Sequence, residues 1–227
     1  MVTGLIIGAT GLVGKSILAN ADKSSFFNQI YTIGRRECPG VSEKVQCLVE
    51  ADTEKWPELI KTEAAESKIF FSGFGSTRAS AGSADNFVEI DYGVNYECAK
   101  AAKEAGVETF VLISSGSANE NSPFLYLKTK GQLEKDIIEL RFQRTIILQP
   151  GALLGERETS RFFEGIMQKF MYVIRDTPLS FLGYPILGED VGRIAVEIAE
   201  KSNVADEPIV EIISAKELTE MAKKFHE

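Results

Sequence analysis

The sequence has little of the chemistry that metal and disulfide sites require. It contains three cysteines and one histidine in 227 residues. Cys38, Cys47 and Cys98 stand far apart without a CxxC pair, and His226 is the penultimate residue. Because structural zinc takes four clustered ligands, the sequence predicts no metal site. An odd number of isolated cysteines indicates a reducing compartment, and therefore an intracellular protein.

Long apolar runs and an excess of basic charge are also missing. No stretch reaches the roughly 18 apolar residues of a transmembrane helix, and the first residues lack the charged region of a signal peptide. Lys and Arg number 25 against 33 Asp and Glu, which gives a formal net charge of -8. Such a field repels nucleic acid and anionic lipid. We therefore expect a soluble, cytoplasmic protein with no nucleic-acid partner.

Short β-rich segments alternate with longer helical ones through the first 150 residues. The expected strands are apolar on both faces, as in a parallel sheet covered on both sides. They are 4–8, 30–34, 45–49, 68–73, 109–115 and 144–150. Helices are expected at 12–22, 55–65, 86–106 and 124–141. This alternation predicts an α/β fold with a Rossmann-type doubly wound parallel sheet, which binds ligands at the carboxyl ends of its strands.

The segment GLIIGATGLVGKS, residues 4–16, joins the first expected strand to the first helix through three glycines. Gly8, Gly11 and Gly14 give the spacing GxxGxxG rather than GxGxxG, and the spacing of a Walker P-loop is not met. Three glycines allow a tight turn, close approach of the backbone to a pyrophosphate, and close packing of helix on strand. An ordinary turn is the alternative. The strand before it and the helix after it favour a dinucleotide site.

Two arginines follow the second expected strand, where a Rossmann site reads the adenosine ribose. The segment IGRRE places Arg35 and Arg36 there, and Glu37 comes too late to replace them. An acid at this place binds the 2′-hydroxyl of NAD, whereas guanidinium groups suit the 2′-phosphate of NADP. The alternative is a solvated charge pair after a strand. The pattern favours NADP(H).

The length suits one domain, and the pattern changes after Pro150. We expect a dinucleotide-binding core over 1–150 and a small substrate-side lobe over 151–227 that shares the same core. The lobe holds an expected helix at 189–201, a strand near 208–213 and a last helix. Its segment 162–174 is rich in Phe and Met, which is typical of core packing, a substrate lid or a subunit contact.

A second group of polar residues follows the fifth expected strand. Tyr126 and Lys130 stand at i and i+4 of a predicted helix, after Ser114 and Ser115 at the end of that strand. An ammonium beside a phenol favours the phenolate, so Tyr126 is a candidate proton donor, and a serine hydroxyl can polarise a carbonyl. Alternate strand residues face opposite sides, so Ser114 and Ser115 remain rivals. A YxxxK pair alone is weak evidence for a catalytic site. Its place after the fifth strand of a sheet that begins with the glycine turn makes the signal more specific.

At these residues the chain resembles the short-chain dehydrogenase/reductase superfamily. The segments GATGLVG, GRRE, FGSTR, YLKTKGQLE and PGALLGERETSR are similar to the atypical group that contains the mammalian Tat-interacting tumour-suppressor protein and related fungal mitochondrial outer-membrane proteins. The resemblance implies Ser114, Tyr126 and Lys130 as the catalytic set. It also implies a cofactor site made of Gly8, Thr10, Gly11, Leu12, Val13, Gly14, Arg35, Arg36, Gly73, Phe74, Gly75, Ser76, Thr77, Tyr126, Lys130, Pro150, Gly151 and Leu153. One departure is Gln149, where relatives commonly have Arg.

These observations predict an NADPH-dependent reductase of a small carbonyl substrate. The alternative is a regulatory or scaffold protein that binds NADPH without turnover. The fungal resemblance implies peripheral association with the mitochondrial outer membrane, through the surface of 162–174 or through a partner protein. The sequence does not decide whether the protein forms a homodimer.

Overall fold

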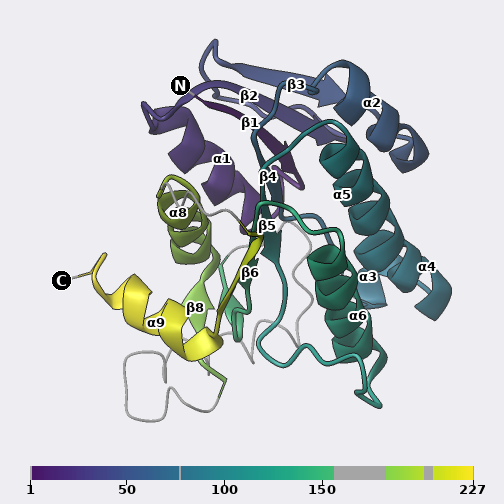
Figure 1. The fold of residues 1–227 in the computed structure, drawn as a ribbon. Helices are drawn as coiled ribbons and strands as arrows, with labels where there is room; N and C mark the ends of the chain where they lie inside the picture. The colour runs from purple at the N-terminus through teal and green to yellow at the C-terminus, as the bar shows by residue number, and fades with distance from the viewer. Residues whose placement is uncertain (1, 77, 156–182, 202–206, 227) are drawn as a thin grey trace.

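The computed structural model describes residues 2–76, 78–155, 183–201 and 207–226. Thr77 and the segment 162–174 lie outside the described residues. Within these ranges the chain forms three layers, with a parallel sheet between two sets of helices (Figure 1). The doubly wound α/β fold expected from the sequence is confirmed.

Seven strands form the main sheet in the order β3-β2-β1-β4-β5-β6-β9, and every neighbouring pair is parallel. Their bounds are β1 Val2–Ile7, β2 Phe27–Gly34, β3 Val45–Val49, β4 Ile69–Ser72, β5 Thr109–Ile113, β6 Arg144–Leu148 and β9 Ile209–Ile213. A separate pair joins β7 (Leu153–Leu154) to β8 (Ile186–Leu187). The chain moves outward from β1 to β2 and β3, then returns to β4 on the other side of β1. This reversal creates the crevice in which open α/β sheets bind ligands.

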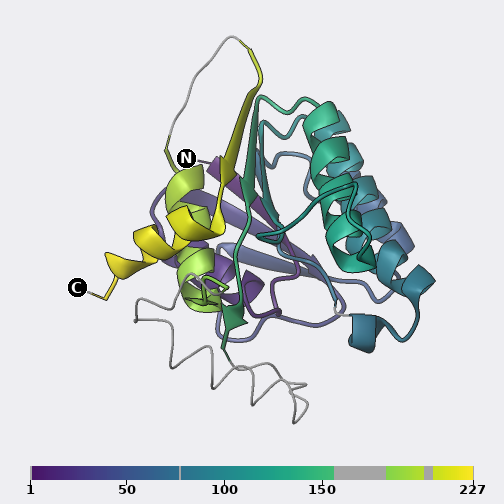
Figure 2. The ribbon, with the colours of Figure 1, turned by 90° about the horizontal axis from the view of Figure 1, so that it is seen from below.

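Helices cover both faces of the sheet, as two views at right angles show (Figures 1 and 2). One face carries α1 (Gly14–Lys23), α8 (Gly188–Ala199) and α9 (Ala215–Lys223). The other carries α2 (Trp56–Thr62), α5 (Asn95–Glu104) and α6 (Leu125–Glu139). The shorter elements are η1 (Thr53–Lys55), α3 (Arg78–Ala81), α4 (Ala84–Val88) and η2 (Glu89–Val94).

Alternate residues of the central strands enter one of two apolar cores. Ile6 of β1 and Phe71 of β4 pack in the core that includes α1 and α8. Leu5 and Phe70 of the same strands pack in the core that includes α2, α5 and α6. All four side chains are fully buried. Burial on both faces explains why these strands read as continuous apolar runs in the sequence.

The last helices and strand belong to the same layers as the first 150 residues. Strand β9 pairs with β6, and α8 packs against α1. The buried Arg144 of β6 connects them: its Nη1 donates to the carbonyl oxygens of Ile198 and Lys201 at 3.0 and 2.7 Å, and its Nε lies 2.5 Å from Glu211 Oε1. The division at residue 150 into a core and a substrate-side lobe stays a prediction. No helix in the described ranges is long and apolar enough to cross a bilayer.

One expected element has a different form. The helix predicted at 86–106 consists of α4, the π-helical turn η2 and α5 in succession. A π-helical turn inserts an extra residue into the helical repeat, and such turns occur frequently at functional sites. Here η2 carries Asp91, which is completely buried.

Candidate active site

A cavity of about 720 Å³ lies at the carboxyl ends of β1, β2, β4 and β5. Most of the residues proposed from the sequence line it: Gly8, Thr10, Gly11, Leu12, Val13, Arg35, Arg36, Gly73, Phe74, Gly75, Ser76, Ser114, Tyr126, Lys130 and Leu153. Gly14, Pro150, Gly151 and Ser115 are not among the described residues of its lining. Residues from 8 to 153 therefore meet at one edge of the sheet.

The glycine turn is formed by close contact between backbone segments. Gly8 has φ +77°, a conformation that favours glycine, and the Gly11 N–H donates to its carbonyl oxygen at 2.9 Å. A Cβ on Gly8 would lie 2.6 Å from the backbone of Gly73, and a Cβ on Gly14 would overlap the carbonyl oxygen of Gly8. Gly14 therefore acts by allowing α1 to start against the turn, although it does not line the cavity.

This turn fits the pyrophosphate of a dinucleotide. Helix α1 begins directly after it, and its N-cap residue, Val13, provides no side-chain cap. A helix N-terminus carries partial positive charge and N–H groups that favour anions. The glycines let the backbone of the turn line the cavity directly at Gly8 and Gly11. The donors and the space that a bound phosphate requires are both present.

The two arginines lie at the β2 side of the cavity. Arg35 and Arg36 follow Gly34, the last residue of β2, and both are exposed. Nη2 of Arg36 donates to Oγ1 of Thr10 at 3.3 Å, which connects the arginines to the glycine turn. Guanidinium groups in this position suit a phosphate monoester.

The other side of the cavity carries the serine, the tyrosine and the lysine. Ser114 follows β5, and its N–H donates to Leu148 of β6 at 2.8 Å. Its buried Oγ has no hydrogen bond of good geometry within the described residues, and it lies close enough to Glu134 to favour the charged form of that carboxyl. Tyr126 and Lys130 lie one turn apart on α6, with exposed fractions of 40% and 5%. The Tyr126 ring packs against Phe87 with centroids 5.8 Å apart.

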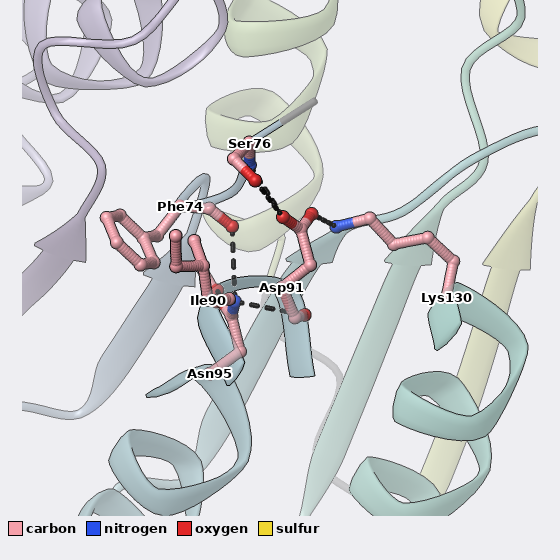
Figure 3. A network of polar contacts seen from close by, with 7 residues as sticks. Phe74, Ser76, Ile90, Asp91, Asn95 and Lys130 are labelled. Carbon is pink, nitrogen blue, oxygen red and sulfur yellow. Dashed lines mark hydrogen bonds and ion pairs between the residues drawn. The ribbon is translucent and has the colours of Figure 1, made fainter. Parts of the chain in front are cut away.

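Lys130 is held by a carboxylate that sequence reasoning missed. Its Nζ lies 2.8 Å from Oδ1 of Asp91, and both side chains are buried. The other carboxylate oxygen, Oδ2, accepts hydrogen bonds from the N–H and the hydroxyl of Ser76, each at 2.7 Å (Figure 3). Asp91 therefore joins α6 to the loop that follows β4.

A second missed residue, Asn95, anchors the same loop. Its Nδ2 donates to the carbonyl oxygens of Phe74, Ile90 and Asp91 at 3.3, 3.1 and 3.2 Å (Figure 3). Its Oδ1 accepts from the Ser72 hydroxyl at 2.5 Å. Asn95 thus binds the end of β4, the loop and the π-helical turn together.

The sequence contained a signal for these two residues. Phe87, Asp91, Asn95, Cys98 and Ala102 recur at helical spacing and are all buried. Two polar side chains inside an otherwise apolar stripe require polar partners, because burial of an unpaired polar group is costly. The stripe therefore predicts a buried polar network, but it does not identify Lys130 and Ser76 as its partners.

Glu134 is a second buried carboxylate near Lys130. It lies one turn further along α6, and Nε2 of Gln149 donates to its two oxygens at 3.1 and 3.0 Å. Burial raises the pKa of Glu134, while Ser114, Gln149 and Lys130 oppose part of that rise. Gln149 therefore gives this carboxyl a neutral partner.

Comparison with known proteins agrees with this geometry. The model of the family described as NAD dependent epimerase/dehydratase matches residues 4–172. The mitochondrial protein FMP52-1 of Scheffersomyces stipitis is 52% identical over 98% of this chain and 100% of its own length. The mitochondrial protein FMP52 of Candida albicans is 46% identical over 97% of this chain and 98% of its own length.

Solved structures with little sequence similarity share the fold. A UDP-glucose 4-epimerase from Thermotoga maritima superposes with a TM-score of 0.69 at 12% identity, covering 98% of this chain and 82% of its own. A short chain dehydrogenase family protein from Francisella tularensis gives a TM-score of 0.64 at 13% identity, covering 96% and 98%. With the glycine turn, the strand order and the full-length similarity to fungal relatives, the chain belongs to the NAD dependent epimerase/dehydratase family and, within it, to the group of the FMP52 proteins.

Proposed function

We propose that the chain is an NADPH-dependent reductase of a small carbonyl compound. The observation that carries this proposal is that Ser114, Tyr126 and Lys130 line the same cavity as the glycine turn and the two arginines. In the sheet, β2 and β5 are separated by β1 and β4, which places them about 14 Å apart at the usual strand spacing. The arginine side and the tyrosine side can therefore hold opposite ends of one dinucleotide.

The chemistry divides among the three side chains. Bound NADPH would supply a hydride to the carbonyl carbon of the substrate. Tyr126 gives its hydroxyl proton to the carbonyl oxygen, and the Ser114 hydroxyl donates a hydrogen bond to that oxygen. Lys130 stabilises the phenolate that Tyr126 becomes and, by resemblance to the superfamily, holds the nicotinamide ribose. The Tyr126 side chain is partly exposed, so a proton can return to it from water.

Preference for NADPH over NADH follows from Arg35 and Arg36. Both are exposed at the cavity, within reach of an incoming 2′-phosphate. Several structural neighbours are described as bound to NAD, so the phosphate is the point on which this chain would differ from them.

The test is NADPH consumption by purified protein across a panel of aldehydes and ketones. We expect turnover with NADPH, slower turnover with NADH, and a loss of about 10²- to 10⁴-fold with either cofactor when Tyr126 is replaced by Phe. Wild-type protein that binds NADPH tightly and oxidises it with no member of the panel would contradict the reductase proposal for those substrates.

A second candidate is a protein that binds NADPH as a signal and does not turn over. The buried ion pair between Lys130 and Asp91 supports it, because a neutralised ammonium stabilises a phenolate less. This candidate predicts tight NADPH binding that Tyr126→Phe leaves unchanged, together with no consumption by the wild type.

For location, we propose peripheral attachment to the mitochondrial outer membrane, because the FMP52 relatives are named mitochondrial. In fractionated fungal cells the protein should follow mitochondria, be released by alkaline carbonate and be digested by protease added outside. Retention after carbonate would contradict peripheral attachment. A homodimer or a protein partner remains a proposal, and light scattering of the pure protein tests the dimer.

A further inference from the structure

Asp91 joins three segments that lie far apart in the sequence. It belongs to η2, its Oδ1 contacts Lys130 of α6 at 2.8 Å, and its Oδ2 accepts two hydrogen bonds from Ser76 in the loop after β4 (Figure 3). Asp91 is fully buried, yet it is part of the cavity lining. The carboxylate therefore lies directly behind the surface that meets a ligand.

The ion pair is a poor explanation of stability by itself. Removing two charges from water costs about as much as their attraction returns, and well-packed apolar residues often stabilise a fold equally well. The apolar stripe of α4 and α5 offers such packing on either side, at Phe87 and Cys98. A charged pair at this position thus calls for a role beyond packing.

The geometry around the pair indicates that role. A Cβ on Gly75 would lie 2.9 Å from Asp91 Oδ1 and 3.4 Å from Lys130 Nζ, so the pair packs directly against the loop backbone. Of the carboxylates that face Lys130 in the described structure, Asp91 is in direct contact, while Glu134 is occupied by Gln149. Among the described residues, Asp91 contacts both the ammonium and the loop, whereas Asn95 holds the loop without contacting Lys130.

We propose that Asp91 is a positioning residue that builds the nicotinamide end of the cavity, by holding Lys130 and the loop Gly73–Ser76 in the arrangement that receives the nicotinamide ribose. This inference rests on the proposed function only in placing the nicotinamide at the Lys130 side. The adenosine end uses the glycine turn and the arginines. The contacts of Asp91 described above go to Lys130 and Ser76, and the loop touches the glycine turn at its first residue, Gly73, which packs against Gly8. Loss of Asp91 should therefore weaken binding of the whole dinucleotide and spare binding of its adenosine half.

The experiment compares two ligands by calorimetric titration: NADPH, and adenosine 2′,5′-bisphosphate, which lacks the nicotinamide half. We expect Asp91→Asn to weaken the binding of NADPH about 10- to 100-fold, the range for lost hydrogen bonds to a charged group. The binding of the bisphosphate should weaken less than about two-fold. The matched control is Asp85→Asn, an exposed acid of α4 outside the cavity lining, and both of its affinities should equal those of the wild type.

A second variant keeps the inference testable if Asp91→Asn does not fold. Ser76→Ala removes one of the two bonds from the loop to Asp91 and leaves the buried ion pair intact. We expect the same selective loss, about three- to ten-fold for NADPH. Equal losses for both ligands, or no loss for either, in variants that melt at the wild-type temperature would overturn the role of Asp91.

This result separates the inference from the proposed function. Wild-type protein that binds NADPH but reduces no substrate would contradict the reductase proposal. The titrations would still decide whether Asp91 positions the nicotinamide end. Conversely, the wild type could be an active reductase while Asp91→Asn binds both ligands with unchanged affinity. That result would support the proposed function and contradict the role of Asp91.

Discussion

The two ends of the cavity are built in different ways. The adenosine end consists of a glycine turn and two exposed arginines, and the side-chain bond from Arg36 to Thr10 is exposed. The nicotinamide end consists of the partly exposed Tyr126 and of buried side chains after β5, on η2 and on α6, joined by the Lys130 to Asp91 pair and by Asn95. Backbone geometry suffices to hold a phosphate, whereas placing a proton donor and an ammonium requires side chains fixed from several directions. Changes at Tyr126 and at Arg35 should therefore separate the rate of the chemical step from the affinity for the cofactor.

The largest effect is expected at the nicotinamide end. Tyr126→Phe removes the proton donor and keeps the ring that packs on Phe87, so the fold and NADPH affinity should persist. Turnover should fall about 10²- to 10⁴-fold, the usual contribution of a general acid. Steady-state rates at saturating NADPH measure it. Tyr96→Phe is the control, because Tyr96 stacks on Tyr92 and is not among the described residues of the cavity lining. Turnover of Tyr126→Phe within a few-fold of the wild type would remove the tyrosine from the mechanism.

At the adenosine end we expect a loss of affinity without a loss of chemistry. Arg35→Ala should weaken NADPH by about 1.5 to 3 kcal/mol, the range for hydrogen bonds to charged groups, and leave NADH nearly unchanged. The maximal rate at saturating NADPH should stay close to that of the wild type. Lys23→Ala removes one exposed charge from the last turn of α1 as a control. Equal losses for the two cofactors would show that Arg35 does not discriminate between them.

The turn itself should tolerate almost no side chain. In Gly14→Ala the new methyl group would overlap the carbonyl oxygen of Gly8, so α1 must move away from the turn. Overpacking of this kind costs about 1 to 3 kcal/mol of unfolding free energy, and it should weaken NADPH and NADH alike. Urea unfolding and titrations with both cofactors test this. Gly34→Ala is the control for the unfolding measurement, since its Cβ meets nothing closer than 3.8 Å. Because Gly34 lines the cavity, the titrations are compared with the wild type. A Gly14→Ala variant as stable as Gly34→Ala would contradict the packing role.

The smallest effect concerns Glu134, whose pKa is raised by burial above its ordinary value of 4.5. The folded state thus holds this proton more tightly than the unfolded state. The carboxyl therefore does not reduce the free energy of unfolding below pH 4.5, and it reduces that free energy increasingly as the pH rises from 4.5 through the folded pKa. Glu134→Gln cannot ionise and should lose less stability over that rise. Urea unfolding at a series of pH values measures the difference, with the exposed Glu139→Gln as control. A difference between Glu134→Gln and wild type that does not change with pH would contradict the raised pKa.

The same contrast explains what the sequence predicted. The glycine turn and the YxxxK pair each lie within a few consecutive residues, and strand and helix periods place them, so their meeting at one edge of the sheet followed from the parallel order of strands. Asp91 and Asn95 depend on the π-helical turn η2, which no period of 3.6 or 2 indicates. Their partners Ser76 and Lys130 are 15 and 39 positions from Asp91, and only the folded chain brings them into contact. Local patterns therefore predicted the positions of the motifs and a buried polar stripe, and only the structure identified Lys130 and Ser76 as the partners of that stripe.

The most direct test of the proposed site is a crystal structure of the protein with NADPH. We expect the pyrophosphate at the turn from Gly8 to Gly14 and the 2′-phosphate within hydrogen-bond distance of Arg35 or Arg36. The nicotinamide ribose should contact Lys130, with the Lys130 to Asp91 pair still in place. A nucleotide bound elsewhere, or bound with its nicotinamide at the arginines, would contradict the proposed division of the cavity.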